Sequence, residues 1–176
     1  MPKIIENVRE QLLEVAKRQT MERGYSGTTI RSVASECGLA VGTVYNYFES
    51  KDMLIASFMV EDWHRAMSAM PSSEGADARE VLFGIYSAIK SFAAEYRELF
   101  SDPEAAKVFA ASSPERHILL REQLADAIIP VCEGEDVEHR RFIARFSAES
   151  LLTFTMSGES FERISSAILK VIKNNI

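Results

Sequence analysis

The sequence predicts an all-α fold, and three observations support that prediction. Apolar residues recur at steps of three and four through most of the 176 residues, which is the period of amphipathic helices. No stretch keeps the alternation of a half-buried strand. Hydrophobic residues make up 47% of the chain, and only five prolines and eight glycines interrupt it, so a buried helical core is expected. We expect about nine helices, divided between residues 1–50 and residues 51–176.

A first amphipathic helix is expected over residues 4–22. Val8, Leu12 and Val15 share one stripe of this helix, and charged residues occupy its other sides. Gly24 is expected to end the helix, because glycine interrupts a helical pattern at little steric cost.

The segment from residue 28 to residue 52 predicts two short helices joined by a tight turn. Ile30 and the apolar residues that follow it at steps of three and four share the inward face of the first helix. Thr28 or Thr29 can cap its N-terminus with a side-chain oxygen. Gly38 can end it, since glycine readily takes the left-handed conformation found at helix ends.

The second of these helices separates an apolar side from a polar side. At 100° per residue, Val44 and Phe48 fall together, where they can seal a small core. The opposite side carries Gly42, Thr43, Asn46 and Tyr47. Two short helices with an outward polar face on the second are typical of a helix-turn-helix, whose second helix enters the major groove of DNA.

The whole run GYSGTTIRSVASECGLAVGTVYNYFESKDML, residues 24–54, resembles the DNA-binding domain of the TetR family of transcriptional regulators. Shared elements include Tyr25 after Gly24, a threonine pair before the first short helix, and Lys51 at the head of the next helix. The resemblance covers about residues 8–58 and implies a helical effector-binding and dimerisation domain after the DNA-binding domain. It assigns DNA contacts to Thr29, Arg31, Val41, Gly42, Thr43, Tyr45, Asn46, Tyr47 and Lys51. Ala40 departs from the family pattern, which commonly has a capping serine there.

Further helices are expected over residues 51–70, 77–100, 103–111, 114–132, 137–157 and 159–174. Ser50 is placed to cap the first of these, which would connect the two parts of the chain. The segment at residues 71–75, PSSEG, should break it. Asp102 and Ser113 each precede a proline, a combination that favours a helix start.

The last two predicted helices carry more apolar surface than one core contact requires. We therefore expect a two-fold homodimer in which they form a four-helix bundle, as the family resemblance also implies. A monomer with a large core is the alternative. The expected interface residues are Phe142, Phe146, Leu151, Phe154, Phe161, Ile164, Ile168, Val171 and Ile172.

An internal pocket for a mostly apolar small molecule is a further hypothesis for the second part. Candidate lining residues are Trp63, Tyr86, Phe92, Tyr96, Phe109, His117 and Phe146. Core packing is the alternative for each of them taken alone. Bound effector would favour a spacing of the two DNA-binding heads that does not match a palindromic operator, and would so relieve repression.

The charge distribution is compatible with a nucleic-acid partner. The net charge is −6, but residues 1–60 carry seven basic and seven acidic residues, whereas residues 61–176 carry 13 and 19. The acidity therefore belongs to the part that is not expected to meet DNA.

Other classes of protein find little support in the sequence. The two cysteines lack metal-type spacing, no signal or membrane-spanning pattern is present, and we expect a soluble cytoplasmic protein. The three histidines fall on separate predicted helices without a nucleophile or phosphate-binding loop, so no catalytic site, metal or cofactor is expected. A helical dimeric scaffold or adaptor, whose second part binds no small ligand, is the alternative function.

Overall fold

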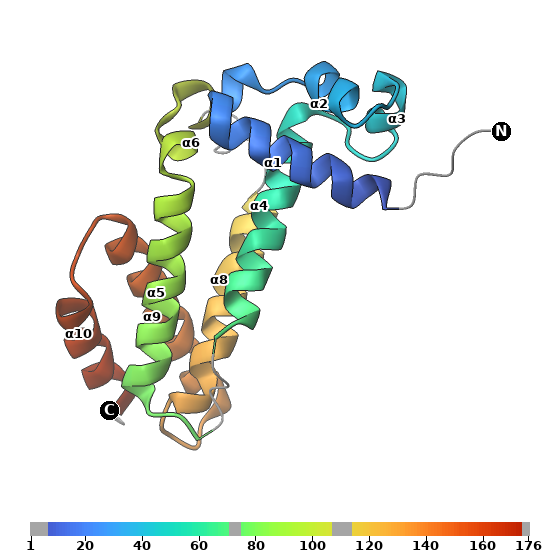
Figure 1. Ribbon diagram of the computed structural model, residues 1–176. Coiled ribbons are helices and arrows are strands. Elements are labelled where there is room, and N and C mark those ends of the chain that lie inside the picture. Colours follow the sequence, from blue (N-terminus) through green and yellow to red (C-terminus); the bar gives the residue numbers. More distant parts are fainter. Residues whose placement is uncertain (1–6, 71–74, 107–113, 174–176) are drawn as a thin grey trace. The chain divides into compact units, whose positions relative to one another are not determined.

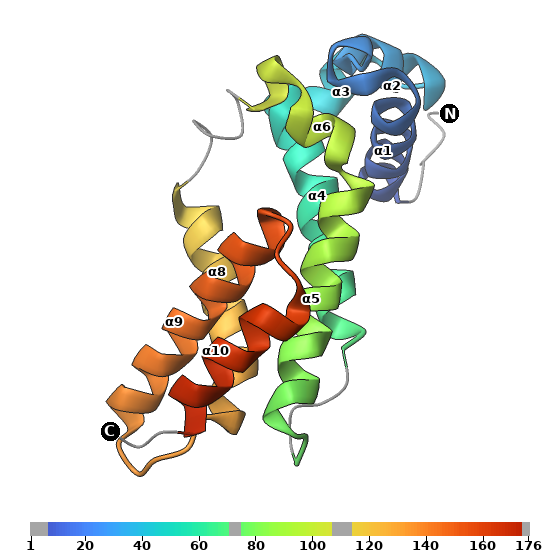
Figure 2. The ribbon, with the colours of Figure 1, turned by 90° about the vertical axis from the view of Figure 1, so that its left-hand side faces the viewer.

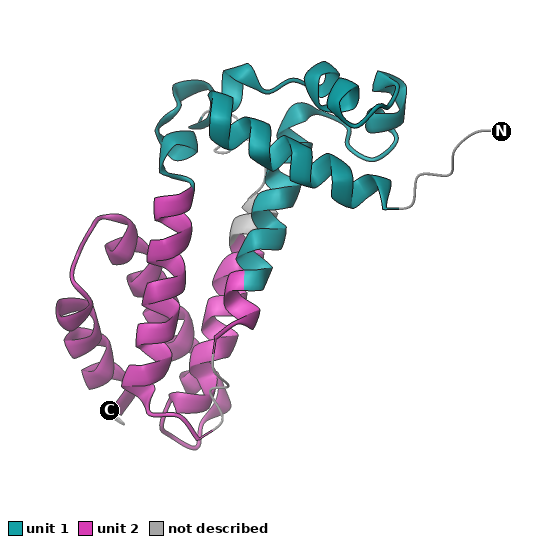
Figure 3. Cartoon of the chain, in the orientation of Figure 1, with its two compact units in different colours: residues 1–65, 96–112 teal, residues 66–95, 113–176 magenta. Residues whose placement is uncertain are grey.

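The structure is a computed structural model that describes residues 7–70, 75–106 and 114–173, with the side chains of 114–117 excepted (Figure 1). All regular elements within these ranges are helices, which confirms the predicted fold class. None of the described helices is long and apolar enough to cross a membrane. The chain forms two compact units, residues 1–65 with 96–112 and residues 66–95 with 113–176 (Figure 3).

Unit 1 contains the predicted helix-turn-helix. Its helices are α1 (Val8–Gly27), α2 (Ile30–Glu36), α3 (Val41–Tyr45), α4 (Lys51–Ser68) as far as Arg65, and α6 (Arg97–Ser101). The core of this unit is built from side chains of α1 to α4 that have no exposed surface, namely Leu12, Ala16, Val33, Val44, Leu54 and Ile55. Gly24 interrupts α1 with a positive φ of 73°, and one further turn follows it.

Unit 2 is a bundle of longer helices. It contains α5 (Ala78–Glu95), α8 (Pro114–Ile128), a 3-10 turn (Ile129–Val131), α9 (Val137–Met156) and α10 (Phe161–Lys173). Helix α9 packs against α5, α8 and α10, and its neighbour α10 runs beside it (Figure 2). Gly158 makes the turn between α9 and α10 with a φ of 86°. The predicted division between residues 50 and 51 separates a DNA-binding part from an effector-binding part. It stays a prediction, because the two units are defined by packing contacts alone.

Two of the expected helices differ from the structure or extend beyond its described part. The predicted helix over 77–100 is wrong as one element, because α5 ends at Glu95 and α6 begins at Arg97. Tyr96 lies between them with φ −98° and ψ 15°, and its hydroxyl donates to the buried carboxylate of Asp62. The helix expected from residue 103 begins there, capped by Asp102, and residues 107–111 lie outside the described residues.

Candidate DNA-binding site

Helix α2 begins with a complete capping box. The Ser32 backbone N–H donates to the Thr29 hydroxyl oxygen at 3.0 Å, and the Thr29 backbone N–H donates to the Ser32 hydroxyl oxygen at 3.1 Å. At its other end Gly38 has a φ of 67°, and the Leu39 N–H donates to the Ala34 carbonyl at 2.9 Å. Both predicted ends of α2 are therefore present, and this helix leads into the turn before α3 at a fixed point.

Helix α3 ends at Tyr45, earlier than the sequence predicts, and together with the turn that follows it presents the predicted two-sided surface. Val44 is 0% exposed and Phe48, just after the helix, is 4% exposed, so both face the core. Tyr45 and Tyr47 are 53% and 47% exposed, and Gly42 and Asn46 are exposed as well. The other predicted contact residue on the polar side, Thr43, is half-buried. Val41 adds exposed apolar surface beside them, at 37%.

Gly42 has no internal reason to be glycine. A Cβ atom built at this position meets no atom within 4 Å, and its φ is not in the left-handed region. Internal packing would therefore accept a side chain at Gly42. The absence of one matters only to whatever approaches this face from outside.

The N-terminus of α3 lacks a side-chain cap. Ala40 occupies the N-cap position with φ −70° and ψ 144° and makes no capping hydrogen bond. Ala40→Ser keeps this backbone and adds an acceptor for a free N–H of the first turn, so it should raise the free energy of unfolding by about 1 kcal/mol. Urea denaturation of the two proteins tests this prediction, and equal midpoints would contradict it.

The remaining predicted contacts come from the N-termini of α2 and α4. Thr29 and Arg31 are exposed. Lys51 is half-buried; its ammonium donates to the Tyr25 carbonyl oxygen at 3.0 Å and lies 3.6 Å from the centre of the Tyr25 ring. The Tyr25 hydroxyl donates to Asp52, and burial followed by this carboxylate raises the pKa of Tyr25 well above its ordinary value. These contacts join the start of α4 to the end of α1, so Lys51 has a structural role whether or not it meets DNA.

One buried residue of this region, Gln19, is polar and was not predicted from the sequence. Gln19 of α1 is 1% exposed and bonds to Ser32 and Glu36 of α2. Its signal in the sequence is an amide on the inward stripe of α1, one turn beyond Val15. Apolar periodicity alone does not identify such a residue.

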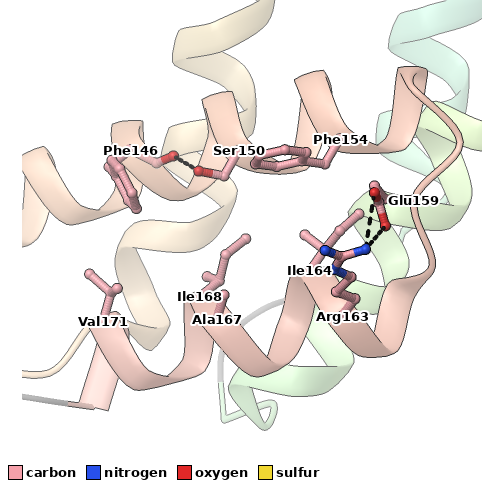
Figure 4. Close-up of a pocket in the computed structure, with 9 residues that line it drawn as sticks. All are labelled: Phe146, Ser150, Phe154, Glu159, Arg163, Ile164, Ala167, Ile168 and Val171. Carbon is pink, nitrogen blue, oxygen red and sulfur yellow. Dashed lines mark hydrogen bonds and ion pairs between the residues drawn. The ribbon is translucent and has the colours of Figure 1, made fainter.

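Unit 2 holds a groove of about 320 Å³ between α9 and α10 (Figure 4). Phe146 and Phe154 line it from α9, and Ile164, Ile168 and Val171 line it from α10. Arg163 and Glu159 form an ion pair at one end, 3.3 Å apart. The groove is therefore apolar along most of its length with a charged end.

The predicted ligand-binding residues do not all share one environment. Trp63 and Tyr96 are buried in unit 1, where Tyr96 bonds to Asp62. Tyr86 and Phe92 are half-buried on α5 in unit 2, and Phe146 is 49% exposed on α9. Phe109 and the side chain of His117 lie outside the described residues.

Burial divides the predicted dimer-interface residues into two groups. Leu151, Phe161, Ile164, Ile168 and Ile172 are at most 5% exposed and belong to the core of their own chain. Phe142 is 66% exposed, Phe146 and Phe154 are each 49% exposed, and Val171 is half-buried. Only this second group offers substantial surface to a partner.

Comparisons with known proteins agree with the helix-turn-helix. A family model described as bacterial regulatory proteins of the tetR family matches residues 12–58. The HTH-type transcriptional repressor Rv1474c of Mycobacterium tuberculosis is 26% identical over 192 residues, spanning 100% of this chain and 98% of that protein. The HTH-type transcriptional regulator PksA of Bacillus subtilis is 41% identical over 61 residues, spanning 34% of this chain and 30% of that protein.

Solved structures show the same fold. The TetR family repressor AlkX from Dietzia is 17% identical with a TM-score of 0.64, over 93% of this chain and 98% of that one. The multidrug binding protein EbrR, solved with imidazole, is 17% identical with a TM-score of 0.60, over 96% of each chain. Together with the exposed polar face of α3, these similarities show that residues 12–58 match the DNA-binding domain of the tetR family of bacterial regulatory proteins, and that the chain has the fold of solved TetR-family proteins.

Proposed function

We propose that this protein is a TetR-family transcriptional regulator, a homodimeric repressor that binds a palindromic operator and is released from it by a mostly apolar small molecule. The observation that carries the proposal is the outward polar face of α3, which is supported from beneath by Val44 and Phe48. The whole-length similarity to a Mycobacterium repressor favours repression over activation.

The proposed DNA contacts divide into base contacts and phosphate contacts. In the major groove, Asn46 would pair with an adenine by accepting at its amide oxygen and donating from its amide nitrogen, and Thr43 would meet a thymine methyl or a phosphate. Gly42 would let the backbone of α3 approach the DNA closely. Phosphate contacts would come from Tyr45, Tyr47, Lys51, Thr29 and Arg31, with Val41 packing at the edge of the groove.

Two protomers would be needed for a stable complex, since one short helix makes few base contacts. We propose that α9 and α10 of each protomer form the shared four-helix bundle. The exposed Phe142, Phe146 and Phe154, together with the apolar groove, support this placement. Such a dimer would place two copies of α3 about 34–36 Å apart, or a multiple of that, on the operator.

Selection of bound DNA from a random pool, followed by a salt titration, tests the proposal. A repressor should enrich a palindrome, and its affinity should fall steeply with salt because bound phosphates release counterions. A helical adaptor would enrich no sequence. Compounds that bind, detected as a rise in melting temperature, should then release the selected DNA; if none does, the effector part of the proposal fails.

Three substitutions separate the proposed contact types. Asn46→Ala should relax preference at one base pair, by about 1–3 kcal/mol. Tyr47→Phe and Lys51→Ala should instead weaken binding to all sequences about equally, and Lys51→Ala should flatten the salt slope by about one unit. Titration of each variant against the selected operator and its single-base variants measures these effects. An unchanged base preference in Asn46→Ala would contradict the base contact.

A further inference from the structure

Gln19 connects α1 to both ends of α2. Its Oε1 accepts a hydrogen bond from the Ser32 hydroxyl at 2.6 Å, and its Nε2 donates to Glu36 Oε2 at 2.5 Å. Ser32 stands in the first turn of α2, and Glu36 is its last residue. A single side chain that is 1% exposed therefore holds one helix at two points a turn apart.

The chemistry of the amide gives this contact a direction. The amide oxygen only accepts and the amide nitrogen only donates, so Gln19 requires a donor at Ser32 and an acceptor at Glu36. The Ser32 hydroxyl has one proton and two acceptors in reach, Gln19 Oε1 at 2.6 Å and the Thr29 carbonyl oxygen at 2.9 Å, of which Gln19 is the nearer. When the proton is directed to Gln19, the lone pairs of the Ser32 oxygen are available for the Thr29 N–H of the capping box. A chain of hydrogen bonds thus runs from Gln19 through Ser32 to Thr29. Thr29 lies at the end of α2 where the proposed DNA contacts are.

Simple stability does not require an amide at this position. Leucine has a similar volume and would fill the same space between the two helices, without the cost of burying a polar group. Apolar packing has no preferred direction, however, whereas two hydrogen bonds a turn apart fix the rotation and tilt of a seven-residue helix.

We propose that Gln19 is a positioning residue for operator recognition, which holds α2 at the rotation that brings Thr29 and Arg31 onto the DNA and leads α3 into the groove. The inference rests on the proposed function, because it assigns Gln19 a role in DNA binding. The hydrogen bond from Gln19 lowers the pKa of Glu36, and the charge of Arg18 lowers it further, whereas partial desolvation acts in the opposite direction. Glu36 is therefore suited to accept the hydrogen bond from Gln19 as an ionised carboxylate.

The experiment compares wild type, Gln19→Leu, Arg31→Ala and the double variant, each as the full chain, on the operator selected from the random pool. Gln11→Leu is the matched control, because it makes the same chemical change at an exposed position of α1. Melting temperature is recorded for each protein. Binding to an unrelated duplex at low salt measures the sequence-independent contacts to phosphate, which do not require exact positioning of α2.

We expect Gln19→Leu to fold with a melting temperature close to that of wild type and to bind the operator about tenfold more weakly. Its binding to the unrelated duplex should change little. Arg31→Ala should reduce operator affinity by a several-fold smaller factor when Gln19→Leu is already present, because a misplaced Arg31 contributes less to binding. Gln11→Leu should bind as wild type does.

Two other results would overturn the inference. One is an operator affinity of Gln19→Leu equal to that of wild type. The other is a loss of operator affinity on Arg31→Ala that is the same in wild type and in Gln19→Leu. If Gln19→Leu fails to fold, Ser32→Ala tests the same link from the α2 side and should likewise reduce the Arg31→Ala penalty. If wild type itself selects no DNA sequence, the proposed function fails first, and the inference fails with it.

Discussion

Phe48→Ala is expected to lower the free energy of unfolding of this protein by about 3–5 kcal/mol. The Phe48 ring is 4% exposed, and the Arg9 guanidinium lies 5.8 Å from its centre. Truncation removes the ring from the core of unit 1 and leaves a cavity beneath α3, next to the fully buried Val44. Urea denaturation measures the loss, and operator binding should disappear at temperatures where the variant unfolds.

The neighbouring aromatic residue supplies the control. Tyr47 is 47% exposed and points away from that core, so Tyr47→Ala should change the free energy of unfolding by at most about 0.5 kcal/mol. Its effect should fall on DNA affinity instead. Equal destabilisation by the two substitutions would show that α3 is not divided into a supporting side and a binding side, and the proposed contact scheme would fail with that division.

The helix-turn-helix could be predicted from the sequence because its signals are local. Thr29 and Gly38 mark the ends of α2 by their chemistry, and the spacing of Val44 and Phe48 identifies the buried side of α3. Each signal depends on residues within a turn or two of one another. Such patterns can be recognised in the sequence without knowing which segments pack against the helix.

The missed features depend on contacts between distant residues. Nothing local to Tyr96 ends a helix, and the predicted helix continues through it, whereas the structure breaks there and bonds Tyr96 to Asp62, 34 residues earlier. Similarly, Phe161 and Phe154 are equally apolar in the sequence, yet one is 5% exposed and the other 49%. Periodicity predicts an apolar stripe, but it cannot divide that stripe between the core of the chain and a partner.

Asp62 is the centre of a buried polar cluster in unit 1. It is 8% exposed and accepts from Lys17 at 2.5 Å, from Arg65 at 2.7 Å and from the Tyr96 hydroxyl. These bonds join α1, α4 and the segment just before α6. Burial alone would raise the pKa of Asp62, but the hydrogen bonds from Lys17 and Tyr96 and the two nearby cations outweigh burial and hold its pKa below the usual range.

Asp62→Ala should therefore lower the free energy of unfolding by about 3 kcal/mol, near the lower limit for breaking a buried ion pair. The lower limit applies because Lys17 is 32% exposed and can regain water, whereas Tyr96 has no exposed surface. Asp62→Asn keeps an acceptor for Tyr96 and should lose less. Glu61→Gln is the control, since Glu61 pairs with Arg9 at the surface and such pairs contribute at most about 1 kcal/mol.

The pH dependence of stability distinguishes the charge of Asp62 from its packing. A carboxyl whose pKa is lower in the folded state stabilises the protein above its unfolded pKa of about 4, and this contribution is lost as the pH falls through the folded pKa. The melting temperature of wild type should thus exceed that of Asp62→Asn by a constant amount above about pH 5. The difference should narrow as the pH falls below about 4, because protonation removes from wild type the charge that the variant already lacks. A difference that stays constant down to pH values where wild type unfolds would show that the carboxylate acts by shape and hydrogen bonding alone, without its charge.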